Sequence, residues 1–277
     1  MTRRDFITGG IAAAGAACLA SPVRSNMGGY NFSVISRHEV PLDIPYVTDG
    51  LVAMYDAIWN AGVGKHREGA TTWKNLTGIS ALDFDISGMI VGDDYIDTNL
   101  KTAYTEAILP QTEFTIECVA RMSAGIGTWD QANYYLGYGN GLGMPLGFGV
   151  TRSWATMLFY GYGNTDDKCN SDAFDVPYAD DSFSILRSWS GQCLTDGTRK
   201  MYKNGVLLPK RIANARQGEF TPSDNNSLMI GVHMWSTGAS TNYKPHFLLS
   251  NLRFYDRALT EEEVQWNNAI DSERFSL

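Results

Sequence analysis

The strongest constraint on the fold is a run of nine residues in which apolar and polar side chains alternate. The run spans residues 114–122, FTIECVARM. A period of two places one set of side chains on one face of a β-strand and the other set on the opposite face. We therefore expect a half-buried strand with its apolar face against a core. The apolar set is Phe114, Ile116, Cys118, Ala120 and Met122.

Short runs of the same kind recur along the chain, separated by clusters of Gly, Asn, Asp and Pro. The 277 residues include 28 Gly and twice as many Asp as Glu, a composition that favours turns. Asn204 and Gly205 predict a hairpin, because Asn-Gly supplies the two positive φ angles of a type I′ turn. The other predicted strands are 51–55, 95–98, 133–138, 146–151, 155–160, 183–190, 228–232 and 247–255.

Many short strands without a long helical pattern predict an all-β protein, a jelly-roll sandwich of two antiparallel sheets. No Pro-rich linker or change of composition interrupts the chain after about residue 45. The strands are therefore expected to form one domain over residues 46–277.

One short helix is predicted at the C-terminal end. Thr260 and Glu263 have the spacing of a capping box, in which each satisfies a backbone N–H at the start of the helix. Val264, Asn267 and Ile270 then form a stripe that can lie against the sandwich.

The first twenty residues have the pattern of an export signal. Arg3 and Arg4 precede an aromatic residue and a Gly- and Ala-rich apolar run, which ends before Ser21. This arrangement resembles a twin-arginine signal peptide, with an ordinary secretory signal or a buried helix as alternatives. The run is too short and too weakly apolar for a transmembrane anchor. We expect residues 1–20 to be removed, residues 21–45 to form a lead-in segment, and the protein to be periplasmic, on the cell surface or secreted.

The sequence around each of the four cysteines predicts a role for it. Cys18 follows Gly-Ala-Ala, which loosely resembles a lipoprotein box, so a lipid anchor at Cys18 is a second possibility. Cys118 lies in the alternating strand and is expected to be buried and inert. Cys169 and Cys193 lie on polar stretches and could form a disulfide that closes a loop. No Cys or His spacing points to zinc.

Four stretches in order along the chain carry a family resemblance: DGLVAMYD at 49–56, TTWKNLTG at 71–78, MYKNG at 201–205, and the run from 248 to 264. Together they resemble a laminin-G-like domain of the concanavalin A-like lectin/glucanase superfamily, over about residues 47–275. The resemblance implies two packed antiparallel sheets, one of them concave, with ligands bound on the concave face or along its rim. It does not select a function, because this fold hosts enzymes, lectins and protein-binding modules.

The sequence offers little for catalysis. Glycoside hydrolases that this chain resembles in fold carry paired acids on one strand, and no E-x-D-x-x-E arrangement is present. Alternation places Asp83 and Asp85 on one face, although Asp at strand ends more often makes turns. The four histidines have no supporting motif such as G-x-S-x-G. The prediction is that the protein is not an enzyme, with an unrecognised glycoside hydrolase as the weakest alternative.

Aromatic side chains among Gly and Asn offer more for binding. Their flat faces stack on sugar rings while amides and carboxylates bond the hydroxyls. A core position is the competing interpretation for each, since sandwiches bury Trp and Tyr between their sheets. The cluster comprises Trp129, Tyr134, Tyr135, Tyr138, Trp154, Tyr160, Tyr162, Trp189 and Trp235. The predicted ligand-binding residues are Trp129, Tyr134, Tyr135, Trp154, Tyr162 and Trp235.

An acidic stretch at residues 164–175 is the candidate metal site. Calcium takes six to eight oxygen ligands, and the stretch contains four carboxylates and two Asn amides. A solvated acidic loop is the competing interpretation, because the EF-hand pattern is missing. The candidate ligands are Asp166, Asp167, Asp172 and Asp175.

Net charge excludes one class of partner. The formal charge of −8 and the absence of long Lys or Arg runs give no surface for phosphate backbones, so nucleic acid is not expected as a partner. The sequence therefore predicts an exported, non-catalytic binding module for a glycan. The alternative is a protein-adhesion or surface-structural module that binds a surface protein and has no sugar site.

Overall fold

The computed structural model describes residues 45–59, 70–99, 101–108, 113–122, 133–139, 146–151, 156–162, 169–175, 185–196, 198–212, 227–233 and 247–277. All described residues belong to one compact unit, which the chain forms over residues 37–277. For β8, β9, β10 and β11 the description concerns backbone pairing. Among the described residues, no helix is long and apolar enough to cross a membrane.

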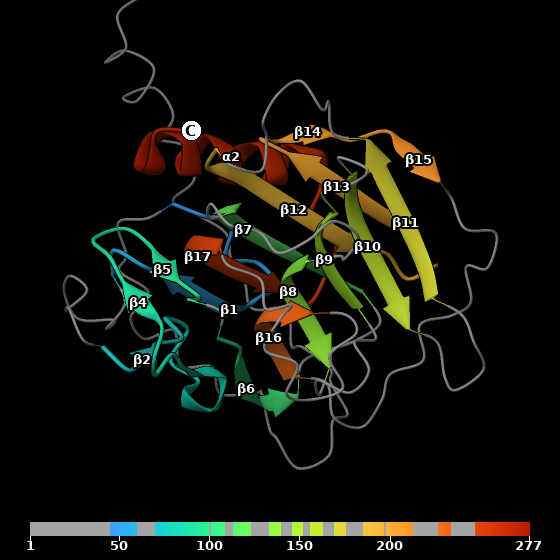
Figure 1. The fold of residues 1–277 in the computed structure, drawn as a ribbon. Helices are drawn as coiled ribbons and strands as arrows, with labels where there is room; N and C mark the ends of the chain where they lie inside the picture. The colour runs from blue at the N-terminus through green and yellow to red at the C-terminus, as the bar shows by residue number, and fades with distance from the viewer. Residues whose placement is uncertain are drawn as a thin grey trace, which may run out of the picture. The chain divides into compact units, whose positions relative to one another are not determined.

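Two large antiparallel sheets make up the second unit (Figure 1). The eight-stranded sheet has the order β14-β13-β12-β7-β17-β5-β4, and β1 also pairs with β17. Its strands are β1 (Leu51–Asp56), β4 (Ile90–Val91), β5 (Ile96–Asp97), β7 (Phe114–Met122), β12 (Arg187–Cys193), β13 (Arg199–Lys203), β14 (Val206–Leu207) and β17 (Phe247–Tyr255).

The seven-stranded sheet has the order β15-β11-β10-β9-β8-β16-β6. A separate pair joins β2 (Thr72–Trp73) to β3 (Phe84–Asp85), with the 3-10 turn η2 (Ser80–Leu82) between them. The strands of the seven-stranded sheet are β6 (Ala103–Ile108), β8 (Asn133–Gly139), β9 (Leu146–Thr151), β10 (Thr156–Tyr162), β11 (Cys169–Asp175), β15 (Lys210–Ile212) and β16 (Ser227–His233).

The main hydrophobic core lies between the two sheets. Ile116 and Phe254 of the eight-stranded sheet belong to the same buried cluster as Leu228 and Ile230 of the seven-stranded sheet. Trp189 is also part of it, fully buried, as expected for an aromatic side chain inside a sandwich. The prediction of an all-β sandwich of antiparallel sheets with a short C-terminal helix is therefore confirmed.

The Asn-Gly hairpin forms as predicted. Asn204 and Gly205 have φ angles of 49° and 74°, and Lys203 pairs with Val206 directly beside the turn. Both positive φ angles belong to a type I′ turn, whose twist matches that of the strands. The strand predicted at residues 183–190 is shifted, since β12 begins at Arg187 and follows its partner β7 to Cys193.

Helix α2 (Glu261–Phe275) begins with the predicted capping box. The Thr260 hydroxyl accepts from the Glu263 N–H at 3.2 Å, and the Glu263 carboxylate accepts from the Thr260 N–H at 2.8 Å. The predicted stripe is confirmed: Val264 and Asn267 are buried, and Ile270 is half-buried and packs against the cluster of Tyr46, Met54 and Leu76. The buried face of the helix also continues to Asp271 and Phe275.

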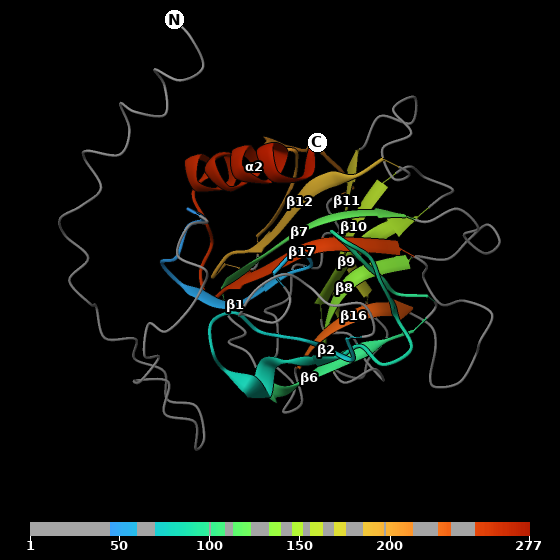
Figure 2. The ribbon, with the colours of Figure 1, turned by 90° about the vertical axis from the view of Figure 1, so that its left-hand side faces the viewer.

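Helix α2 explains why the prediction of a half-buried strand at residues 114–122 is wrong. Thr115, Glu117 and Val119, on the face of β7 away from the main core, are as buried as the apolar set. In Figure 2, α2 lies over one side of the sheet that contains β12, β7 and β17, and the seven-stranded sheet lies on the other side. The structure is thus layered as helix, sheet and sheet, and the central sheet has no free face under α2.

Candidate ligand-binding face

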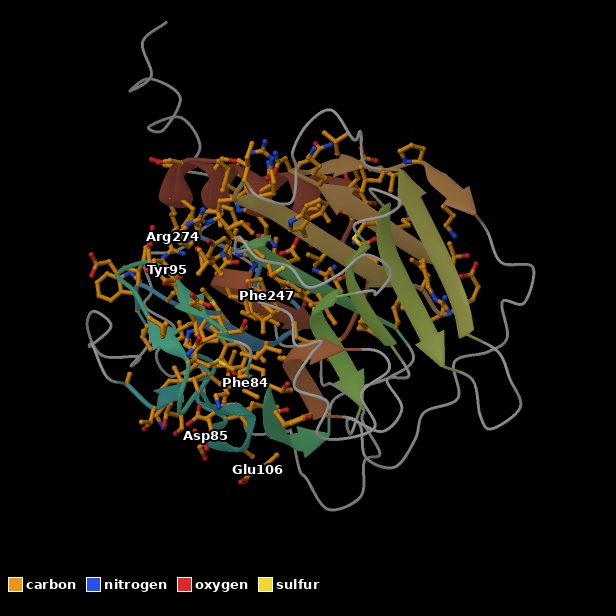
Figure 3. All side chains as sticks on the ribbon, viewed as in Figure 1. Phe84, Asp85, Tyr95, Glu106, Phe247 and Arg274 are labelled. Atoms are coloured by element: carbon orange, nitrogen blue, oxygen red, sulfur yellow. The ribbon has the colours of Figure 1, made fainter. Side chains whose placement is uncertain are left out.

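Strand β6 shows which face of the seven-stranded sheet is open to solvent. Ala103 and Thr105 are 2% and 4% exposed, whereas Tyr104 between them is 45% exposed. Glu106, two positions further on, is also exposed, and Figure 3 shows its side chain extending away from the sandwich. Alternation along the strand therefore places Tyr104 and Glu106 on the outer face.

Backbone pairing extends this outer face from β6 to β11, across six of the seven strands. Tyr104 pairs with Met229 of β16, which pairs with Gly137 of β8. Gly137 pairs with Gly147 of β9, and Gly147 pairs with Tyr160 of β10. Residues directly opposite each other in an antiparallel sheet belong to the same face. Tyr160 in turn pairs with Ser171 of β11. We call these six positions the cross-sheet row, which comprises Tyr104, Met229, Gly137, Gly147, Tyr160 and Ser171.

The cross-sheet row has two glycine positions at its centre, with the Tyr160 position next to Gly147 and the Met229 position between Gly137 and Tyr104. Gly137 and Gly147 carry no side chain above the backbone, so a ligand can approach the sheet closely there. Aromatic rings beside such a floor provide flat apolar surfaces together with a hydroxyl. Of these residues the sequence had suggested Tyr160, within the aromatic cluster, but not Tyr104. The sequence signal for Tyr104 is alternation, because in the run AYTE it lies between the small residues Ala103 and Thr105.

Three of the predicted ligand-binding residues lie in described strands. Tyr162 is two positions from Tyr160, which places it on the same outer side of β10. Tyr134 pairs with Val232, two positions from the core residue Ile230, so its register position is on the core side of the sheet. Tyr135 lies at an irregularity, where the register between β8 and β9 shifts. Trp129, Trp154 and Trp235 lie outside the described residues.

Two of the four candidate calcium ligands lie in a described strand. Asp172 and Asp175 both lie in β11, three positions apart, so alternation places them on opposite faces. Asp166 and Asp167 lie outside the described residues. No group of three His, Cys, Asp or Glu close enough to hold a metal ion is found within the described part of the chain. Calcium binding at this stretch stays a prediction.

Asp83 and Asp85 serve the turn around β3. The Asp83 carboxylate accepts from the Asn75 N–H at 2.8 Å and from the Lys74 ammonium at 2.6 Å. Asp85 accepts from the Ser87 N–H at 2.9 Å, and hydrogen bonds from Ser87 lower the pKa of that carboxyl. These bonds agree with the turn interpretation of the pair.

Cys118 and Cys193 are the two cysteines whose side-chain burial the structure describes. Cys118 is fully buried, which confirms that part of the prediction, and burial raises the pKa of its thiol well above the ordinary value, in the direction of low reactivity. Cys193 is buried at the end of β12. The proposed bridge from Cys193 to Cys169 stays a prediction.

The central sheet carries charged residues beneath α2. The Arg253 guanidinium donates from Nε to Glu117 at 2.9 Å and from Nη1 and Nη2 to the two Asp271 oxygens at 2.9 and 2.8 Å. All three side chains are at most 2% exposed. We call them, with the side chains that complete their hydrogen bonds, the polar cluster, which comprises Glu117, Arg253, Asp271, Tyr46, Ser188, Asn251 and Asn267.

Burial and pairing shift the pKa values of Glu117 and Asp271, the two carboxyl groups of the polar cluster, in opposite directions. Burial raises the pKa of Glu117 to about 6, although Arg253 opposes the shift. Burial also tends to raise the pKa of Asp271, but Arg253 and hydrogen bonds from Tyr46 and Asn251 together hold it below its ordinary value. Asp271 accepts two bonds from Arg253, one from Tyr46 at 2.7 Å and one from Asn251 at 2.7 Å, and these favour its charged form.

The polar cluster has acid and base groups but no access for a ligand. Perturbed pKa values often mark active sites, yet ion-pair networks produce them as well. Because Arg253 and Asp271 are fully buried between β17 and α2, we assign the cluster to holding the helix on the sheet. Sequence reasoning missed it, although Glu117 and Arg253 stood at polar positions of two strongly apolar strands.

Comparison with known proteins supports the fold and no finer statement. No protein-family model matches the chain, and no curated protein matches it. Among solved structures the chain is similar to Trypanosoma rangeli sialidase, at 13% identity and a TM-score of 0.53, over 81% of this chain and 33% of that one.

Two toxin domains are similar to the same extent. The binding domain of Paraclostridial Mosquitocidal Protein 1 matches at 14% identity and a TM-score of 0.54, over 79% of this chain and 52% of that one. The botulinum neurotoxin type G receptor-binding domain matches at 12% identity and a TM-score of 0.54, over 80% and 52%. The chain thus spans about a third of the sialidase and about half of each toxin domain, and it shares with them a β-sandwich fold.

Proposed function

We propose that this protein is an exported, non-catalytic binding module that holds a glycan on the outer face of its seven-stranded sheet. The cross-sheet row carries the proposal, because it sets two bare glycine positions between Tyr104 and Tyr160 on a face where Tyr104 is 45% exposed. The names of two similar structures, a binding domain and a receptor-binding domain, support a binding role for this fold. The resemblance to laminin-G-like domains supports it as well.

Glycan-array binding of the purified protein tests the proposal. The variants Tyr104→Ala and Tyr160→Ala are each expected to weaken binding about tenfold, since an aromatic contact contributes roughly 1 kcal/mol beyond its buried area. Val206→Ala is the control, because Val206 is 66% exposed but lies on β14 of the other sheet. An array without any bound glycan would overturn the proposal.

The predicted loop aromatics belong to the same experiment. Trp129→Ala and Trp235→Ala are expected to weaken binding if these residues form the rim of the site. Retention of binding in both variants, with loss in Tyr104→Ala, would confine the site to the sheet. Shortening of the bound glycan during incubation would instead favour a hydrolase.

A protein partner is the second candidate, and one observation favours it. Strand β14 is an edge of the eight-stranded sheet, and its two residues, Val206 and Leu207, are 66% and 44% exposed. An apolar edge strand can pair with an extended segment of another protein. Binding to a surface protein that is lost in Val206→Lys and kept in Tyr104→Ala would favour this candidate over a glycan.

Export and calcium binding are part of the proposal. A mature N-terminus at Ser21 would support cleavage after residue 20, and a lipid-modified Cys18 would establish an anchor instead. Calcium held by Asp166 and Asp167 together with Asp172 or Asp175, which alternation places on opposite faces of β11, would raise the melting temperature, and a chelator would lower it again. An unchanged melting temperature under both conditions would remove the calcium site.

A further inference from the structure

We infer that the ligand of the cross-sheet row is an uncharged glycan and that acidic glycans are disfavoured there. This inference rests on the proposed function and names its ligand class. The first observation concerns the charged residues of the strands that carry the row. The six consecutive strands from β11 to β6, which carry the row, contain no Lys and no Arg. Lys210 and Arg211 of this sheet lie in its seventh strand, β15, beyond the end of the row at Ser171.

The residues of the cross-sheet row are themselves neutral. Tyrosine, methionine, glycine and serine offer stacking surfaces, hydroxyls and backbone groups, which suit the C–H faces and hydroxyls of a neutral sugar. A carboxylate or sulfate on the ligand requires a charged donor, and Arg is the side chain best suited to that contact. Among the described residues, the six strands that carry the row provide no such donor.

A negative charge lies beside the row on its outer face. Glu106 is exposed on β6, two positions from Tyr104 and on the same face. An anionic group that binds beside Tyr104 would be repelled by this carboxylate, and the net charge of −8 adds a long-range repulsion. Both effects oppose an acidic ligand and leave a neutral one unaffected.

Two arginines on the helix side of the eight-stranded sheet are engaged with carboxylates. Arg253 pairs with Glu117 and Asp271 beneath α2. Arg257 donates to Glu263 at 2.6 Å. These ion pairs lie on the helix side of the eight-stranded sheet, so the sandwich core separates them from the cross-sheet row.

The test compares matched neutral and acidic glycans on the full-length purified protein. An array of neutral, sialylated, sulfated and uronic acid glycans is screened first. For the tightest neutral oligosaccharide, calorimetry then compares it with the same oligosaccharide carrying one terminal sialic acid. The sialylated form is expected to bind at least about tenfold more weakly at low salt, with a smaller difference at high salt as screening increases.

Charge reversal at Glu106 makes the inference specific to this face. Glu106→Lys is expected to narrow the difference between the two glycans several-fold, while Glu273→Lys, an exposed position on α2 with the same change of charge, is expected to leave it unchanged. Equal or tighter binding of the sialylated form would overturn the inference and leave the proposed function in place. Binding of no glycan at all would overturn both.

Discussion

Arg253 is the residue on which the packing of helix and sheet depends. Its guanidinium binds one carboxylate of its own sheet and one of the helix, and it also lies 4.0 Å above the Tyr46 ring. Removing one partner of a buried ion pair leaves the other charge without compensation, which costs more than the intact pair contributes.

Replacing Arg253 by Met is therefore expected to destabilise the protein strongly. The loss is about 3–5 kcal/mol, because Glu117 and Asp271 would stay buried as neighbouring carboxylates. Urea unfolding followed by circular dichroism measures it. Lys74→Met is the control: it breaks an ion pair in which Lys74 is 49% exposed, and it is expected to cost at most about 1 kcal/mol. Equal costs for the two variants would contradict the assignment of the polar cluster.

Glu117 gives the stability of the protein a defined pH dependence. Burial raises its pKa to about 6 from 4.5, so the folded state binds its proton more tightly than the unfolded chain. The stability that this group contributes is fully present below pH 4.5 and is lost as the pH rises through about 6. The change amounts to about 2 kcal/mol.

Glu117→Gln is expected to remove this part of the pH dependence. Unfolding free energies of the variant and the wild type, measured between pH 4.5 and 7, should differ in slope. Glu273→Gln, at an exposed position on α2, should keep the slope of the wild type. Asp271 acts in the opposite direction at lower pH, because its lowered pKa makes its contribution disappear on acidification. Parallel curves for Glu117→Gln and the wild type would contradict the prediction.

At the scale of elements, local patterns predicted most strands and not their partners. Alternation located the strand at residues 114–122 with its bounds, and Asn204-Gly205 located the hairpin, because both signals lie within a few residues. Alternation could not show that α2 covers the polar face of β7, since the helix lies more than 130 residues further along the chain. Tyr104 was missed for a related reason: its role depends on pairing with β16 and, through it, with β8 and β9.

Strand β16 approaches the segment before β6 so closely that a side chain cannot fit between them. Gly231 has a φ of 73°, and a Cβ there would lie 2.2 Å from the Lys101 carbonyl oxygen. Gly231→Ala is expected to destabilise the protein by roughly 3 kcal/mol, from backbone strain and displacement of that carbonyl.

Gly205→Ala is the matched control for Gly231→Ala. Gly205 has a similar φ of 74°, but its nearest neighbour is the Asn268 side-chain amide, at 3.2 Å, which can move. Its cost is expected to be about 1 kcal/mol. Thermal unfolding of the two variants compares the costs, and Gly231→Ala should also weaken binding to the cross-sheet row. Equal melting temperatures would show that the close approach at Gly231 is not rigid.

At the scale of the whole molecule, the N-terminal part of the described unit is bonded to its C-terminal helix. Tyr46 donates to Asp271 at 2.7 Å and accepts from Arg274 at 2.9 Å. The Val47 N–H donates to Asn267 at 3.0 Å. The residues just before β1 and the C-terminal helix are therefore held to each other by hydrogen bonds that involve side chains.

Tyr46→Phe tests how much this connection contributes. Loss of the hydroxyl leaves Asp271 and Arg274 each one hydrogen bond short, so the expected cost is about 1–3 kcal/mol, or a fall of roughly 2–10 °C in melting temperature. Tyr95→Phe is the control, on a partly exposed ring of the β4–β5 turn, and should change the melting temperature by less than about 2 °C. A fall of the same size in both variants would contradict the connection.

The bonds between residues 45–47 and α2 also determine how the protein bears load. The Trp266 indole donates to the Pro45 carbonyl at 2.7 Å, and α2 in turn bonds Arg253 of β17. Tension applied to the chain at residue 45, while a ligand holds the opposite sheet, is shared between the covalent path into β1 and the bonds to the helix, and both paths lead into β17. That strand is hydrogen-bonded to β7, β5 and β1, so the force enters the sandwich at its most firmly anchored strand and not at an edge that peels.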